Sequence, residues 1–76
     1  MWYEPKDFTE LVEIMRAMND DEYVENDDTG KLRKVCVGGT RATRYELYEE
    51  NEFLGSTPDV VSAASFIAKG WDKYDG

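Results

Sequence analysis

The sequence predicts a small α+β domain in which a helix precedes a three- or four-stranded antiparallel sheet and a second helix follows it. Apolar residues recur at helical spacing near both ends of the chain, and short β-type runs separated by turn residues occupy the middle. The length of 76 residues leaves room for one hydrophobic core. Residues 1–76 are therefore expected to form a single domain.

The first helix is expected from about Asp7 to Met18, because this segment carries apolar side chains at spacings that share one helical face. These side chains are Phe8, Leu11, Val12, Met15 and Met18. Asp7 and Glu10 have the spacing of an acidic capping box at its start. The polar residues 19–21 are expected to end the helix.

The middle of the chain indicates an antiparallel meander with strands at residues 23–25, 32–37 and 43–49, and a candidate fourth strand at 52–54. Residues 26–30 and the pair Gly38-Gly39 are turn signals. A four-residue loop from Gly38 to Arg41 would set Arg33 opposite Glu46, whereas a two-residue loop would set Arg33 opposite Arg44. Pairing of opposite charges favours the four-residue loop, which also sets Leu32 opposite Leu47.

The second helix is expected to begin at residues 56–59, where a hydroxyl cap, a proline and an acid follow one another. Its buried stripe is predicted to be Val60, Ala63, Ala64 and Ile67, with Phe66 beside it. Gly70 suits a left-handed C-terminal cap, onto which Trp71 would fold. The predicted core contains Phe8, Leu11, Met15, Val35, Leu47, Ile67 and Trp71.

The formal charge of 9 − 17 = −8 is divided into blocks along the chain. Residues 1–28 carry −8, residues 29–45 carry +5, residues 46–59 carry −5, and the remainder is neutral. The five bases of the middle block are expected to pair across the sheet with acidic neighbours. They are Lys31, Arg33, Lys34, Arg41 and Arg44. At least ten carboxylates in the two acidic blocks would remain without a base.

Many of these acids fall at predicted turns, and carboxylates spaced over a surface produce a field like that of a nucleic-acid backbone. The expected partner is a basic nucleic-acid-binding protein, with no direct contact to nucleic acid or membrane. A solvated face that keeps the protein soluble is the alternative reading of the same acids. The candidate partner-binding residues are Asp20, Asp21, Glu22, Glu25, Asp27, Asp28, Glu49, Glu50 and Glu52.

Catalytic and metal chemistry find little support in the sequence. Because histidine is absent, the commonest general base is missing, and we expect neither enzymatic activity nor a cofactor. Residues 25–36 match the start of a calcium loop, but Cys36 stands where the bidentate glutamate belongs. One cysteine cannot complete a zinc site, and Cys36 is expected to be buried and inert. No membrane span or signal peptide is recognised, so the expected location is cytoplasmic.

The composition resembles that of small acidic phage-encoded inhibitors, which include anti-CRISPR proteins and uracil-DNA glycosylase inhibitors. The order of helix, three-stranded sheet and helix resembles a type II-A anti-CRISPR family, and residues 66–74 are similar to the last sheet-packing helix of that family, with its Gly-Trp end and nearby Tyr. The resemblance implies binding to a CRISPR effector nuclease at the site that reads the target's adjacent motif. It also implies action in the host cell cytoplasm.

Two other functions are compatible with the sequence. The chain could be an interaction module, as a monomer or a homodimer, that uses the aromatic residues Trp2, Tyr3 and Tyr74. It could instead be a β-sheet nucleic-acid-binding domain that contacts DNA through its basic strand. That strand would present Arg33, Lys34, Arg41 and Arg44.

Overall fold

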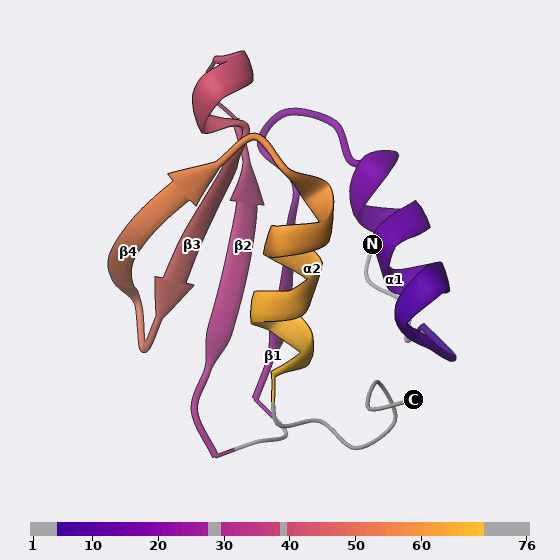
Figure 1. The fold of residues 1–76 in the computed structure, drawn as a ribbon. Coiled ribbons are helices and arrows are strands. Elements are labelled where there is room, and N and C mark those ends of the chain that lie inside the picture. Colours follow the sequence, from indigo (N-terminus) through magenta and orange to yellow (C-terminus); the bar gives the residue numbers. More distant parts are fainter. Residues whose placement is uncertain (1–4, 28–29, 39, 70–76) are drawn as a thin grey trace.

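The structure, a computed structural model, describes residues 5–27, 30–38 and 40–69, and it confirms the predicted α+β order (Figure 1). The sheet has four antiparallel strands in the order β1-β2-β3-β4, so β1 and β4 are its edges. The helices are α1 (Phe8–Arg16) and α2 (Val60–Ala68). The strands are β1 (Tyr23–Asn26), β2 (Arg33–Val37), β3 (Tyr45–Glu49) and β4 (Glu52–Thr57), and the 3₁₀ turn η1 spans Arg41–Thr43.

Helix α1 begins with the predicted acidic cap. The Asp7 carboxylate accepts a hydrogen bond from the Glu10 backbone N–H at 2.9 Å, and the Glu10 carboxylate accepts one from the Lys6 N–H at 3.0 Å. The helix ends at Arg16, earlier than the predicted Met18, because its last bonds tighten into a 3₁₀-like turn. Met18 nevertheless keeps its side chain in the core, with 8% of its surface exposed.

The predicted register of the central hairpin is wrong. Arg33 lies opposite Glu49, and Val35 lies opposite Leu47. The connection between β2 and β3 is longer than four residues because Thr43, which was expected in a strand, belongs to η1. This turn is held by hydrogen bonds between Thr40 and Thr43, and the strands close beyond it with a Gly38 N–H to Arg44 C=O bond of 3.0 Å.

Both helices lie on the same side of the sheet, and the core is between them and that inner face (Figure 1). Helix α2 contacts β1, β2 and β3, and α1 packs against α2. Four of the predicted core residues, Leu11, Met15, Val35 and Ile67, are fully buried. Two more, Phe8 and Leu47, are partly buried against the same cluster, and Trp71 lies outside the described residues.

The start of α2 differs from the prediction. Strand β4 extends through Ser56 to Thr57, so the cap is the carboxylate of Asp59 rather than a hydroxyl. This carboxylate accepts hydrogen bonds from the N–H groups of Val61 and Ser62 and from the Ser62 hydroxyl. The Thr57 hydroxyl accepts a bond from the Asp59 N–H at 3.1 Å, which joins the strand end to the cap. The predicted C-terminal cap at Gly70 lies outside the described residues.

Candidate functional site

The candidate acids are divided between the two ends of the sheet. The first acidic group consists of Asp20, Asp21 and Glu22, which precede β1. The second acidic group consists of Asp27, Glu49, Glu50 and Glu52, at the opposite end, because the register sets Asn26 beside Arg33 and Arg33 beside Glu49. Strand β1 separates Asp27 from Glu22, the nearest member of the first group, by about 16 Å. Glu25 lies between the groups on β1, and Asp28 lies outside the described residues.

The first acidic group is shaped by a tight turn. Asp21 has a positive φ of 71°, a conformation that Asp tolerates better than most residues. Its N–H donates to the Val37 carbonyl at 2.9 Å, and the Glu22 carboxylate accepts a bond from the Asn19 N–H. Asp20 pairs with Arg44 at 3.8 Å, although 76% of the Asp20 side chain is exposed. Asp21 is thus the member of the group whose carboxylate has no hydrogen bond or ion pair within the described chain.

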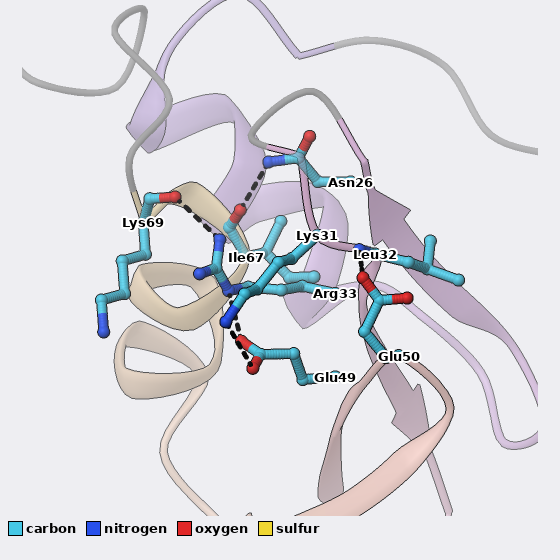
Figure 2. A network of polar contacts seen from close by, with 8 residues as sticks. All are labelled: Asn26, Lys31, Leu32, Arg33, Glu49, Glu50, Ile67 and Lys69. Atoms are coloured by element: carbon cyan, nitrogen blue, oxygen red, sulfur yellow. Dashed lines mark hydrogen bonds and ion pairs between the residues drawn. The ribbon is translucent and has the colours of Figure 1, made fainter.

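The second acidic group is partly neutralised from within the chain (Figure 2). Glu49 is 3.2 Å from Arg33 Nε and 3.8 Å from Lys31 Nζ. The Glu50 carboxylate accepts a bond from the Leu32 N–H at 3.2 Å, while the Glu50 N–H donates to the Leu32 carbonyl. The carboxylates of the exposed residues Asp27 and Glu52 form no hydrogen bond or ion pair with another described residue. Only part of this group is therefore available to a partner.

Two arginines of the basic segment connect the sheet to the ends of the helices. Arg33 donates to the Lys69 carbonyl at 3.1 Å, just past α2 (Figure 2). Its guanidinium also lies 5.9 Å from the centre of the Phe66 ring. Arg44 donates to the Met18 carbonyl at 2.9 Å, just past α1. Cations are favourable at helix C-termini, where backbone carbonyls lack partners. Arg33 and Arg44 thus stabilise the fold, which disfavours the reading of this strand as a DNA-contacting surface.

The outer face of the sheet, opposite the helices, carries a row of aromatic residues. Lys34 Nζ lies 5.4 Å from the Tyr23 ring and 5.9 Å from the Tyr48 ring, and Tyr48 meets Phe53 edge to face. Tyr23 and Phe53 are each 55% exposed. No described helix covers this face (Figure 1).

Cys36 lies half-buried on this outer face, contrary to the prediction that it is buried. Side chains alternate along a strand, and Val35 and Val37 both point into the core, so the residue between them faces outward. Burial raises the pKa of the Cys36 thiol, and nearby Lys34 acts in the opposite direction. The raised pKa keeps the thiol in its less reactive protonated form at neutral pH.

Within residues 5–27, 30–38 and 40–69, no group of three or more His, Cys, Asp or Glu side chains could hold a metal ion. In the same part of the chain, none of the helices has the length and apolar character needed to cross a membrane. No protein-family model, curated protein or solved structure compared with the chain matches it. Its function is therefore inferred from its own residues and contacts.

Sequence reasoning found the acids but not their division into two groups. It also missed the structural use of Arg33 and Arg44, because their partners are carbonyls distant in sequence. Alternation along each strand could have placed Tyr23, Lys34 and Tyr48 on the outer face, because their neighbours Val24, Val35 and Leu47 face the core. The register was needed to show that these outer residues lie beside one another.

Proposed function

We propose that the chain is a small acidic binding protein that occupies the nucleic-acid-binding surface of a basic partner, such as a CRISPR effector nuclease, with carboxylates in place of phosphates. The net charge of −8 produces a long-range field that attracts a basic surface and raises the rate of association. The partner's own phosphate-binding side chains would then pair with the exposed acids.

This proposal rests on the observation that bases of the segment 29–45 contact groups of the same chain, whereas several exposed acids do not. Lys31, Arg33 and Arg44 each form an ion pair with an acid of the same chain, and Lys34 lies over two tyrosine rings. Among the candidate partner-binding acids, in contrast, four exposed ones have carboxylates that form no hydrogen bond or ion pair with another described residue. They are Asp21, Glu25, Asp27 and Glu52. Lys34 lies opposite Glu25 across β1 and β2, but no base of the described residues forms an ion pair with any of the four.

The proposal is tested by capturing proteins from a bacterial lysate on the immobilised chain and eluting them with duplex DNA or RNA. Proteins that nucleic acid displaces are then measured one by one for binding to wild type and to the double variant Glu25→Gln with Asp27→Asn. Each lost exposed ion pair is worth about 0.2–1 kcal/mol, so the loss of two should raise the Kd on the order of two- to thirtyfold. The change should appear mainly in the association rate and shrink with added salt.

The control is the double variant Glu13→Gln with Glu46→Gln, which changes the net charge equally but lies outside both acidic groups. It should weaken binding much less than the first variant. Equal weakening by the two variants would mean that total charge alone drives association. Capture that neither nucleic acid nor the acidic substitutions disturb would overturn the proposal.

A second candidate function, an interaction or homodimerising module, is favoured by one observation. Tyr23, Phe53 and Leu54 are large apolar residues with more than half of their surface exposed, and the last two belong to the edge strand β4. The aromatic residues first considered for such contacts, Trp2, Tyr3 and Tyr74, lie outside the described residues. Analytical ultracentrifugation of wild type and of a Phe53→Ser, Leu54→Ser variant would detect self-association through this edge.

A further inference from the structure

Strand β1 is an edge of the sheet, and no strand of the described residues bonds to its outer backbone groups. In an antiparallel ladder, successive residues bond alternately to one side and the other. The bond from the Val37 N–H to the Glu22 carbonyl sets this alternation, so Val24 and Asn26 bond toward β2. The N–H and C=O groups of Tyr23 and Glu25 therefore point to the open edge. A further strand could pair with them without disturbing the existing sheet.

A groove of about 360 Å³ runs along this edge, between β1 and the end of α1. Ile14 and Met18 form its apolar wall on the helix side, and Tyr23, Val24 and Glu25 form the strand side. Helix α1 packs mainly against α2 rather than against β1, which leaves the edge open along this groove. The groove thus combines free backbone groups with an apolar wall.

The charge around the groove is negative. Asp21 and Glu22 also line it, and with Glu25 they bring three acids to one short edge. Of the two nearby bases, Arg44 pairs with Asp20, and Lys34, which lies opposite Glu25 in the register, is placed over the Tyr23 ring on the outer face and forms no ion pair with Glu25. An occupant with basic side chains fits this field, whereas an acidic occupant would be repelled.

We infer that this groove binds an extended basic segment of the partner, which adds to the sheet as a strand beside β1. The inference rests on the proposed function and specifies how the partner is held. Side chains of an added strand alternate between the two faces of the sheet. Those on the inner face would contact Ile14 and Met18 and should be apolar, and those on the outer face would lie beside Glu25 and should be Lys or Arg.

The other edge strand, β4, is a poorer site for such a segment. A β-bulge between Leu47 and Tyr48 interrupts its pairing, and Gly55 has a φ of 158°. Bulges at sheet edges discourage a further strand from pairing. Glu52 is the single acid on β4, so the edge offers less charge to a basic segment. This contrast makes β4 a suitable internal control.

The test uses a peptide of alternating lysine and valine, of about six residues, the usual strand length. It is titrated into ¹⁵N- and methyl-labelled protein and followed by NMR. We expect shifts at the Tyr23, Val24 and Glu25 amides and at the methyl groups of Ile14 and Met18. Hydrogen exchange of the Tyr23 and Glu25 amides should slow in the complex. A peptide of glutamate and valine should not bind.

Two substitutions at one position separate charge from strand pairing. Glu25→Gln removes the charge and should raise the peptide Kd about two- to fivefold. Glu25→Pro removes both the charge and the outward N–H, and an edge strand tolerates proline at a position whose N–H is not bonded within the sheet. This variant should raise the Kd by about a further two- to tenfold. Glu52→Gln, the matched charge change on β4, should leave the Kd within about twofold of wild type.

Equal affinities of Glu25→Gln and Glu25→Pro, or unchanged exchange of the Tyr23 and Glu25 amides at saturation, would overturn the inference. Peptide shifts confined to the second acidic group or to the outer face would also overturn it, while leaving the proposed function standing. If the Glu25→Gln protein instead self-associates through β1, the acids at this edge serve to prevent pairing between copies of the chain. That result would refute the proposed binding site. The proposed function has its own test in the lysate capture. It would be refuted if captured proteins bound the acidic variants as tightly as wild type.

Discussion

The side chain of Asn26 joins the edge strand β1 to the end of α2. Only 4% of its surface is exposed, and its amide donates to the Ile67 carbonyl at 2.8 Å (Figure 2). This carbonyl belongs to the last turn of α2, where carbonyls lack partners within the helix. A polar residue in the core is therefore used to satisfy a buried backbone group.

Replacing Asn26 with Ala should lower the free energy of unfolding by about 1–3 kcal/mol, because it removes this buried hydrogen bond. That is a large part of the roughly 3–5 kcal/mol expected for a domain of this size. Urea unfolding followed by circular dichroism measures the loss. The exposed Asn19 provides the control, and Asn19→Ala should change stability by no more than about 0.5 kcal/mol. Equal effects of the two substitutions would contradict the structural role of Asn26.

At the scale of elements, the junction of β4 and α2 depends on one carboxylate. Hydrogen bonds from the Ser62 hydroxyl, and then from the backbone N–H groups of Val61 and Ser62, lower the pKa of Asp59 below its ordinary value. These bonds favour the ionised form of Asp59 in the folded state. The helix start therefore gains stability from the ionised cap, and the gain depends on pH.

Asp59→Ala should lower the melting temperature at neutral pH, because it leaves N–H groups at the start of α2 without a partner. The folded-state pKa is depressed, so the stabilisation by charge is present above the ordinary pKa of Asp and is lost as pH falls through the folded-state value. The difference in melting temperature between wild type and variant should thus narrow in acid. Asp59→Asn, which keeps an acceptor at the cap, should show a smaller loss at neutral pH. A difference that stays constant down to low pH would contradict this account.

At the scale of the whole molecule, excess negative charge opposes compaction. Exposed acids lie at both ends of the sheet. Lys31, Arg33 and Arg44 form ion pairs within the chain, and the two arginines also donate hydrogen bonds to carbonyls at the helix ends. Repulsion among like charges destabilises a compact state and is screened by salt. The charge that is proposed to attract a basic partner should therefore reduce the stability of the free protein.

Added sodium chloride should raise the stability of the free protein by about 1 kcal/mol, or about 4–8 °C in melting temperature for a small domain. Scanning calorimetry across a salt series measures this. The variant Glu25→Gln with Asp27→Asn should be more stable than wild type at low salt and should respond less to salt. Stability that falls with salt in both proteins would show that attractive ion pairs, rather than repulsion, dominate the electrostatics.

The sequence by itself determined the type and order of the elements. The helical spacing of Leu11 and Met15, and that of Ala63 and Ile67, correctly predicted which face of each helix is buried. This prediction needs only the geometry of a single helix. The apolar stretch around Val35 likewise predicted that this residue lies in the core, although the same stretch led to the wrong prediction that Cys36 is buried. The acidic character of the turns was also visible, since net charge is additive along a chain.

Tertiary structure alone decided the register, the partners of the bases and the groove beside β1. The register depended on η1, whose hydrogen bonds lengthen the loop between β2 and β3 and bring Glu49, rather than Glu46, opposite Arg33. Arg33 and Arg44 found their acceptors at helix ends far away in sequence. The groove exists because α1 packs on α2 and leaves an edge strand uncovered. Such features depend on contacts between distant segments, which local spacing and charge do not encode.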